Sequence, residues 1–592
     1  MKIEGVLTQV LIWRLRHVSN RNFILILGSL IGVLAGVVAV TLKAAVHFVQ
    51  EALELRFGFA HSFNFLFPFV GLLITYLLST YILHDRPGHG ITDILFSIAQ
   101  RSSIIARTRM YSHMIMSVFT VGFGGSAGLE APSVLTGSAL GSNIGRLMHI
   151  NSKKRTLLIG CGAAGAISGI FNAPVAGVIF SIEVILAEVS LGAFIPLLLA
   201  SVFASLVNHT LADPSIQFYF QINEGFVVEH FPFYSFMGIA CGFVAVMFRQ
   251  IVTRSETLIT RFTHPFVRLL VGALGLSVVV LAFPAVYGEG YDMISSLLTG
   301  DISVLHFDTS LFGRWGDAYP WLLVLFMLLL IIMKTVATGL TLGAGGSGGT
   351  FGPSLVIGGL TGFFFSRLLN YVWGEAPVPE ANLIMTGMCA MMSGVQYAPL
   401  TAIFMIAEVT GGYALFVPLM IVSALAYTTA SLFEPYSIYT KRLIERGQLL
   451  RHDKDKQVLS VMKIRKLIEK DLLPVNRDSS LGDILKLVTL SKRNIFPVLD
   501  AERRLVGIIT LDDFRKIMFD EEAQRTVFAR DLMHSPPAEV GSDENMATVM
   551  EKFERTGAWN LPVIDDGKYV GFLSKSRIFN AYRGQLIRQN RE

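Results

Sequence analysis

Six apolar runs, each long enough to cross a lipid bilayer, constrain the fold of this 592-residue chain more than any other feature. A transmembrane helix needs about 20 consecutive apolar residues. The runs cover residues 23–43, 64–83, 190–208, 231–251, 268–287 and 321–338. Hydrophobic residues make up 52% of the chain, more than a soluble protein of ordinary composition carries. The sequence therefore predicts a mostly α-helical protein that crosses a membrane several times.

Four further apolar segments are dense in glycine and interrupted by proline. They cover residues 110–148, 155–185, 340–372 and 383–430. This composition is typical of broken or partial helices. Irregular backbone at membrane depth is tolerated only where protein covers it or where it lines a water-filled cavity. We therefore expect the path of a transported ion to run between these segments.

Two motifs recur in the same order along the membrane part. Residues 124–133 read GGSAGLEAPS and residues 345–354 read GGSGGTFGPS, and SGIFNAP at 168–174 is repeated as SGVQYAP at 393–399. The order of the copies indicates two related halves. Proteins built in this way usually bind their substrate near the bilayer midplane, where the repeats meet. The sequence leaves open whether the halves are parallel or inverted.

Charged residues divide the chain into two parts of different character. Residues 1–450 contain 46 Asp, Glu, Lys and Arg residues, and residues 451–592 contain 47. We predict a membrane domain over 1–447, with halves at about 23–210 and 231–447, and a junction at 448–456. Basic residues before the first apolar run favour a cytoplasmic N-terminus; they are Arg14, Arg16, His17 and Arg21.

The charged tail carries a repeat of its own. IFPVLDAERRLVGIIT at 495–510 matches NLPVIDDGKYVGFLS at 560–574. Each copy has a β-rich core after an amphipathic helical stretch. The sequence therefore predicts two soluble α/β domains, over 457–522 and 523–592.

The GGSxGxxxPS motifs are suited to binding an anion. Glycine lets backbone N–H groups approach a ligand closely, and the following proline fits the first turn of a helix. A helix N-terminus offers free N–H donors and a partial positive charge. Two such termini can hold chloride without a fixed cation, which would bind too tightly for rapid release.

An enzymatic interpretation of these motifs is weaker. GGSAG fits the nucleophile elbow of α/β-hydrolases, but the motif occurs twice and lacks a hydrolase context, so we predict no enzyme. The three cysteines, Cys161, Cys241 and Cys389, lie in apolar surroundings without metal-ligand spacing. We interpret them as buried thiols and predict no metal site.

Glu130 lies in an otherwise uncharged stretch from His113 to Arg146. An ionisable side chain at membrane depth is expensive and indicates a function. At a helix N-terminus its carboxylate would compete with chloride for the site, and it would leave when protonated or displaced. The alternative is a fixed helix cap. The second motif has Phe351 at the equivalent position.

Together these motifs resemble those of the CLC family of chloride channels and chloride/proton exchangers. GLEAP at 128–132 resembles the family's GxEGP, and GTFGP at 349–353 resembles GxFxP. SIYTKRL at 437–443 is similar to the segment with a chloride-binding tyrosine, and GHGITD at 88–93 is similar to GSGIPE. The tail resembles a pair of CBS domains, so the resemblance covers essentially the whole chain.

The resemblance implies a voltage-gated chloride transport protein that is a homodimer with one pore per subunit. It also implies a plasma-membrane location, with both termini in the cytoplasm and no required cofactor. Glu130 would be the gating residue. Bound chloride would be contacted by the Tyr439 hydroxyl and by the backbone amides of Thr350 and Phe351. His89 stands where the family usually has a serine: it would donate to chloride, bring a titratable charge, or turn away.

One departure from the family bears on mechanism. FSIEV at 180–184 resembles the segment in which exchangers have two successive glutamates, and here Glu183 is followed by Val184. Because valine carries no proton, the resemblance favours a passive channel. A chloride/proton antiporter on the same fold is the alternative, and it would need another proton route. Glu183 would offer one, or would only hold helix ends together.

CBS pairs bind adenine nucleotides in some proteins and only dimerise in others. Thr510 and Asp513 match the T-x-x-D pattern that holds a ribose, whereas the second copy has Ser574 and Arg577. The resemblance therefore implies at most one ordinary nucleotide site. A purely structural dimer contact is the alternative.

Overall fold

The computed structural model describes residues 17–57, 64–85, 87–186, 191–212, 225–305, 321–373, 378–445, 462–491 and 493–582. The chain divides into two compact units, Met1–Leu449 and Leu450–Glu592. The predicted junction at 448–456 lies outside the described residues.

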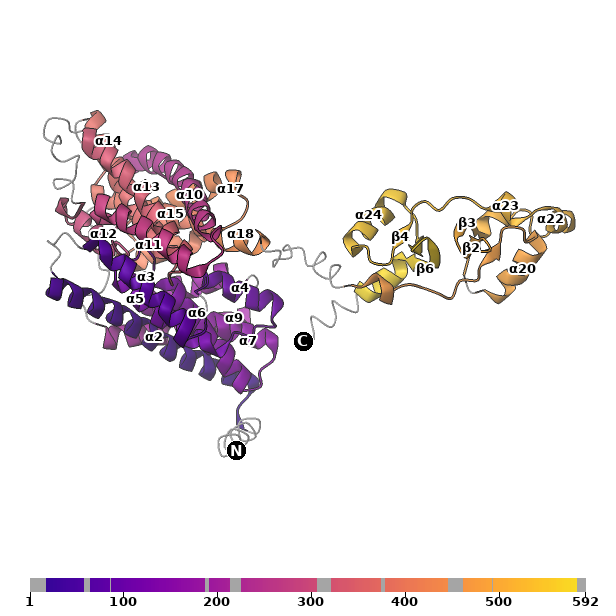
Figure 1. Cartoon of the computed structure of the whole chain (residues 1–592), viewed down its shortest axis with the longest axis horizontal. Coiled ribbons are helices and arrows are strands. Elements are labelled where there is room, and N and C mark those ends of the chain that lie inside the picture. Colours follow the sequence, from indigo (N-terminus) through magenta and orange to yellow (C-terminus); the bar gives the residue numbers. More distant parts are fainter. Residues whose placement is uncertain are drawn as a thin grey trace. The chain divides into compact units, whose positions relative to one another are not determined.

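The first unit is a bundle of helices. The helices of its first half are α2 (Asn20–Phe57), α3 (Phe67–Leu77), α4 (Ile91–Gln100), α5 (Ser112–Gly122), α6 (Glu130–Leu147), α7 (Ser152–Phe171), α8 (Pro174–Phe180) and α9 (Leu191–Leu211). Those of its second half are α10 (Phe231–Thr260), α11 (Pro265–Ala282), α12 (Tyr291–Leu298), α13 (Trp321–Gly343), α14 (Phe351–Trp373), α15 (Glu380–Gln396), α16 (Pro399–Val409), α17 (Phe416–Phe433) and α18 (Ile438–Glu445). The long helix α2 packs along α7 and α9 (Figure 1).

Among the described residues, 8 helices are long and apolar enough to cross a membrane. This confirms the prediction of a helical protein with several membrane spans. Two of the spans, Phe351–Val372 and Phe416–Ile444, lie in segments that the sequence indicated to be broken. The segment 340–372 is interrupted between the end of α13 and the start of α14, and α14 itself is continuous. The glycines within α14 are contact points with a neighbouring helix, so the helix continues through them.

Small residues allow the paired helices of each half to approach closely. Gly137 of α6 lies against Gly162 of α7, and Gly358 of α14 lies against Gly387 of α15. A Cβ atom at any of these positions would overlap the backbone of the partner helix. Close backbone approach through small residues is how helices pack where water provides no driving force. The two crossings occupy equivalent positions in the repeat.

The predicted breaks occur at the SGIFNAP and SGVQYAP motifs. Asn172 ends α7 and Tyr397 ends α15, and both adopt the left-handed conformation, with φ of 53° and 60°. A proline in the first turn, Pro174 or Pro399, then starts the next helix. Proline fits there because the first N–H groups of a helix have no intrahelical acceptor. The same turn is therefore built twice.

The second unit contains two three-stranded sheets. The first is formed by β1 (Val475–Asn476), β2 (Ile495–Leu499) and β3 (Leu505–Thr510), and the second by β4 (Val540–Gly541), β5 (Asn560–Asp565) and β6 (Lys568–Ser574). In each sheet the first strand is parallel to the second, and the second and third form an antiparallel hairpin. Its helices are α20 (Leu481–Leu490), α21 (Leu511–Phe514), α22 (Glu521–Thr526), α23 (Ala529–Leu532) and α24 (Met546–Thr556).

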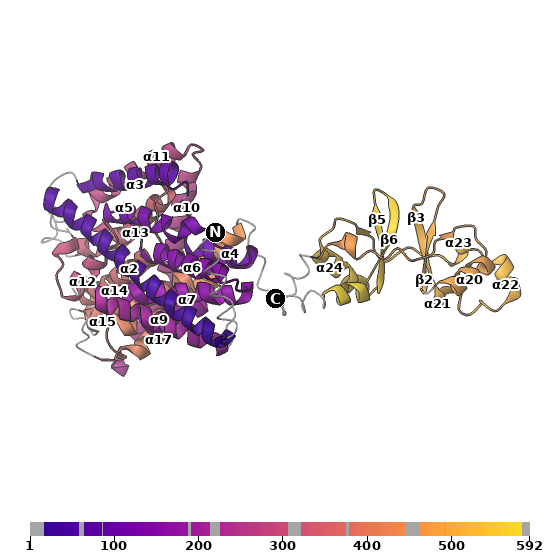
Figure 2. The same ribbon diagram turned by 90° about the horizontal axis from the view of Figure 1, so that it is seen from below.

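The two sheets of the tail share segments across the predicted domain boundary. Ile464 and Leu467 pack in the core around the second sheet, and Ala523 and Ala529 pack in the core around the first. The boundary predicted at 522–523 lies inside α22. Figure 2 shows the hairpins β2–β3 and β5–β6 next to each other. The two CBS-like halves of the unit therefore pack against each other and exchange segments, and they are not two independent domains.

Candidate functional site

The two copies of the glycine-rich motif meet in the structure. The Gly128 N–H donates to the Gly349 carbonyl, and the Gly349 N–H donates to the Gly128 carbonyl, both at 2.9 Å. These residues are equivalent in the repeat. An antiparallel pair of equivalent residues places a local twofold axis between them. The two halves are therefore related by a twofold rotation, which the sequence left open.

Further hydrogen bonds obey the same twofold relation. The Ser126 N–H donates to Thr341 Oγ1, and the Ser347 N–H donates to Thr120 Oγ1, each at 3.1 Å. All four side chains are fully buried. These bonds satisfy amides that the glycine-rich turns leave without a helical acceptor. The loops before α6 and α14 are therefore fixed by each other.

Glu130 is the first residue of α6 and its side chain is 1% exposed. Its Oε2 accepts a hydrogen bond from the Gly352 N–H at 3.2 Å, in the first turn of α14. Its Oε1 accepts a hydrogen bond from the Tyr291 hydroxyl at 2.5 Å. The carboxylate thus lies at the N-terminus of a helix from the other half, where the partial charge of the helix favours an anion.

Tyr439, Thr350 and Phe351 come together close to this point. Thr350 and Phe351 are buried where α14 begins. The Tyr439 hydroxyl, on α18, is buried beside Thr350 and makes no hydrogen bond of standard geometry with the described residues. A buried hydroxyl in this state is costly unless something binds it. Three of the predicted chloride contacts therefore share one place.

His89 faces an acidic side chain. Its Nε2 lies 3.8 Å from Glu256 Oε2. Glu256 also accepts a hydrogen bond from Arg442 at 2.6 Å, and Arg442 belongs to α18, one turn beyond Tyr439. His89, just before α4, is thus part of an ionic cluster with Glu256 and Arg442.

Glu183 and Glu408 bind helix ends across the repeat. Glu183 accepts from the N–H groups of Leu400 (3.2 Å) and Thr401 (2.9 Å), in the first turn of α16. Glu408 accepts from the N–H groups of Val175 (2.9 Å) and Ala176 (2.8 Å), in the first turn of α8. The amide contacts of the two glutamates are twofold equivalents, and Glu183 also accepts from the Thr401 hydroxyl at 2.7 Å. This geometry favours the structural role for Glu183.

Val184 follows in a short π-helix, Ser181–Ile185, at the end of α8. Its side chain is half-buried and packs against the hydrophobic core. No ionisable group exists at this position, so a proton route through it would need a different carrier.

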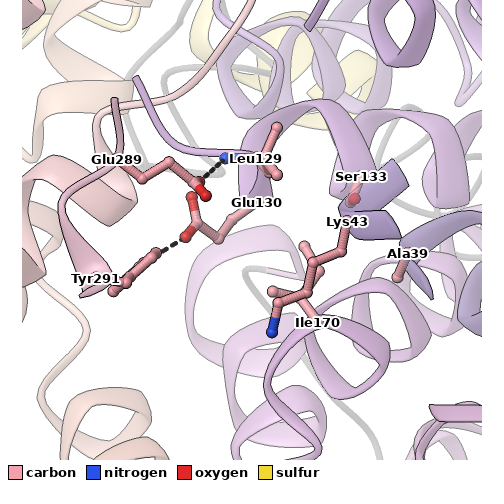
Figure 3. Close-up of a pocket in the computed structure, with 8 residues that line it drawn as sticks. All are labelled: Ala39, Lys43, Leu129, Glu130, Ser133, Ile170, Glu289 and Tyr291. Carbon is pink, nitrogen blue, oxygen red and sulfur yellow. Dashed lines mark hydrogen bonds between the residues drawn. The ribbon is translucent and has the colours of Figure 1, made fainter. Parts of the chain in front are cut away.

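Three residues near Glu130 were not predicted from the sequence: Lys43, Glu289 and Tyr291. Figure 3 shows them around a small cavity of about 10 Å³ beside the gating candidate. The Leu129 N–H donates to Glu289 Oε1 at 2.9 Å. The signal was present, because Lys43 ends the first apolar run and Glu289 closely follows the run at 268–287. Charged residues at such positions indicate function for the same reason as Glu130.

Comparison with known proteins decides the family. The sequence profile described as "Voltage gated chloride channel" matches residues 70–431, more than half of the chain. This chain belongs to the voltage-gated chloride channel family. Two CBS-domain matches cover residues 464–520 and 529–584. The predicted resemblance to the CLC family with a C-terminal CBS pair is confirmed, and the family is one of anion transport proteins.

Curated relatives include both channels and exchangers by name. A ClcB-like chloride channel protein of Ralstonia nicotianae is 28% identical over 64% of this chain and 85% of its own length. Chloride channel protein CLC-f of Arabidopsis thaliana is 25% identical over 96% of this chain and 81% of its own length. The H(+)/Cl(-) exchange transporter ClcA of Vibrio vulnificus is 25% identical over 75% of this chain and 94% of its own length.

Solved structures share the fold. A slow cyanobacterial Cl-/H+ antiporter aligns with a TM-score of 0.61 and 21% identity, over 73% of this chain and 99% of the other. A eukaryotic CLC transporter aligns with a TM-score of 0.58 and 20% identity, over 94% of this chain and 99% of the other. The CLC chain is therefore a multi-pass integral membrane protein with a CLC-type membrane fold.

In the CBS unit, Thr510 and Asp513 form a capping box at the start of α21. Asp513 Oδ2 accepts from the Thr510 N–H at 2.6 Å and from its hydroxyl at 2.7 Å. His534 Nδ1 lies 3.5 Å from the same oxygen. The two residues predicted to bind a ribose therefore have a local structural role that needs no ligand.

Proposed function

We propose that this CLC protein conducts chloride passively, and that movement of the Glu130 carboxylate opens the path. The observation that carries the proposal is the hydrogen bond from the Gly352 N–H to Glu130. It puts a carboxylate where a helix N-terminus would otherwise accept a chloride ion. A carboxylate in that place blocks the path until it is protonated or displaced.

Behind this block, Tyr439, Thr350 and Phe351 offer a hydroxyl and helix-terminal amides for the ion that follows. None of these three side chains carries a fixed positive charge, so chloride can leave again quickly. Val184 supports the channel because a proton cannot be passed through it. The departure from the family pattern at position 89 places a histidine next to Glu256.

Chloride flux from proteoliposomes tests the role of Glu130. Glu130→Gln removes the charge of the blocking carboxylate but keeps its shape. We expect flux to rise by about tenfold, since a hydrogen bond to a charged group contributes about 1.5–3 kcal/mol. The dependence of flux on pH should be lost. Glu54→Gln, at an exposed acid near the end of α2, is the control. Unchanged flux and pH response in a folded Glu130→Gln protein would refute the gating role.

A chloride/proton antiporter is the second candidate, supported by relatives that are named exchange transporters. The reversal potential under an imposed pH gradient separates the two mechanisms. For a passive channel it follows the chloride gradient alone. For an antiporter it also moves with the proton gradient, and the proton would then need a route that avoids Val184.

We further propose a homodimer in the plasma membrane with one pore per subunit and both termini cytoplasmic. An apolar hollow of about 400 Å³ on α16 and α17 supports a subunit contact there; it is lined by Leu400, Ile403, Phe416, Met420 and Tyr427 among others. Several of these side chains are exposed in the single chain. Mass photometry of the detergent-solubilised protein should give twice the chain mass.

For the CBS unit, nucleotide binding stays a prediction. Thr510 and Asp513 support one adenine nucleotide at most, and their capping contacts support the alternative of a structural pair. Calorimetric titration of the full chain with ATP separates these: a purely structural unit gives no binding heat.

A further inference from the structure

The cavity beside Glu130 shares its walls with a much larger one. Lys43, Leu129, Glu289 and Tyr291 line both the small cavity of about 10 Å³ and a wide cavity of about 620 Å³. The wide cavity also reaches exposed residues at the C-terminal end of α2, such as Glu51. It lies at the end of α2 farthest from the N-terminus, and because the N-terminus is proposed to be cytoplasmic, we call this wide cavity the outer vestibule.

Glu289 is held firmly between the vestibule and Glu130. The fully buried Lys334 donates to the carbonyls of Val286 (2.9 Å) and Gly288 (2.7 Å), which fixes the turn before Glu289. The Gly288 N–H donates to the Gly124 carbonyl at 3.0 Å, which ties this turn to the first motif. The position of the Glu289 carboxylate is thus set by hydrogen bonds that fix the backbone of the preceding turn.

The charges around Glu289 form a compact set. Lys43, Glu130 and Asp292 act on it electrostatically, and Glu289 acts in turn on Lys334. The Tyr291 hydroxyl faces Glu130 within the same set. Figure 3 shows the carboxylates of Glu289 and Glu130 directed toward each other. Two like charges in a poorly solvated place favour a proton on one of them.

The small cavity is lined by both Glu130 and Glu289, so a water molecule inside it would be able to pass a proton between the two carboxylates. Its volume is about that of one water molecule. Ser133, which also lines it, is fully buried, and its hydroxyl has no hydrogen-bond partner among the described residues. A water in this cavity would therefore find a hydroxyl as well as carboxylate oxygens, and a water needs such polar partners to be stable.

We propose that Glu289 is the outer proton partner of Glu130. A proton from the vestibule binds the Glu289 carboxylate, crosses the water-sized cavity and is transferred to Glu130, which returns Glu289 to its ionised form. Protonated Glu130 no longer competes for the helix N-terminus and releases the path. Lys43 balances the charge that remains. This inference rests on the proposed gating role of Glu130.

Glu289→Gln tests the proposal. The amide oxygen can still accept the Leu129 N–H, but the side chain no longer titrates. Loss of a neighbouring negative charge makes Glu130 easier to ionise, so opening by protonation needs a lower pH. In planar bilayers we expect the midpoint of chloride current against vestibule-side pH to fall by about one unit or more. Glu51→Gln, in the vestibule wall but away from the small cavity, should leave the midpoint unchanged.

The Glu130→Gln background separates this inference from the proposed function. There the pH profile should be flat, and adding Glu289→Gln should not alter it. A normal midpoint in Glu289→Gln, or an equal shift without Glu130, overturns the inference while the gating role stands. If Glu289→Gln does not fold, Lys43→Met replaces it: loss of the positive charge should raise the midpoint, and an unchanged midpoint is the contrary result.

Discussion

The two copies of the glycine-rich motif have the same backbone and different chemistry. Gly128 and Gly349 exchange equivalent hydrogen bonds, and a helix starts two residues later in each half. The first residue of one helix is Glu130, and the first residue of the other is Phe351. The backbone of the two motifs is therefore symmetric, and the side chain at one position differs: an ionisable glutamate in one half and an aromatic ring in the other.

The surroundings of these two residues also differ: those of Phe351 are aromatic and those of Glu130 are polar. The Phe351 ring packs against Phe171 and Phe180, with ring centroids 5.7 and 6.2 Å away. Glu130 instead faces the Tyr291 hydroxyl and the Glu289 carboxylate (Figure 3). Aromatic packing holds Phe351 in place, whereas Glu130 is held by polar contacts that protonation changes. One half thus has a packed aromatic ring at this position, and the other has a carboxylate with polar partners, to which the proposed function assigns the gating response.

The largest effect should come from separating Gly128 and Gly349, whose two backbone hydrogen bonds join the motifs; we call this pair the paired frame. Gly349→Val adds a Cβ atom 2.6 Å from the Ala131 Cβ, where nothing can give way cheaply. Overpacking of this kind costs about 3 kcal/mol or more, and it also separates Gly349 from Gly128. We expect a large fall in the yield of monodisperse protein on size exclusion. Gly412→Val, where an added Cβ has open space, should behave as the unchanged protein; equal yields would contradict the paired frame.

The broken helices and the repeated motifs could be predicted from the sequence because their signals are local. Glycine and proline predicted that the segments 155–185 and 383–430 are broken, and the structure has breaks there at Asn172 and Tyr397. The recurrence of GGSxGxxxPS predicted two related halves. Glu130 stood out as a lone charge in an apolar stretch. Each of these inferences needs only neighbouring residues and a general cost for irregular or charged groups inside a bilayer.

The surroundings of Glu130 were not readable in the same way. Tyr291 lies 161 residues from Glu130 in the chain, and no local pattern connects that residue or Lys43 to it. The packing role of Gly358 has a related cause: it lies against Gly387 of α15, and a contact between two distant glycines leaves no local pattern. Such residues are assigned only when the partner element is known.

An intermediate effect should follow from loosening the polar hold on Glu130. Tyr291→Phe keeps the ring and its edge contact with Phe171 but removes the hydroxyl that donates to the carboxylate. A hydrogen bond to a charged group contributes about 1.5–3 kcal/mol, so the blocked state should weaken and chloride flux at neutral pH should rise by about tenfold. Tyr413→Phe, at an exposed tyrosine, should leave flux unchanged. A fall in flux after Tyr291→Phe would mean that the tyrosine serves the open path instead.

The smallest effect should come from Glu183 and Glu408, the two glutamates at equivalent positions in the repeat. Glu183→Gln and Glu408→Gln each weaken two hydrogen bonds from backbone amides at the start of a helix in the other half. The loss of charge at a helix N-terminus costs about 1 kcal/mol, so both variants should melt a few degrees lower, by similar amounts. Because these glutamates are twofold equivalents, neither change should alter the pH dependence of chloride flux. A selective change in Glu183→Gln would show that this residue serves proton movement beside Val184, and the symmetry between the two would then be limited to the backbone.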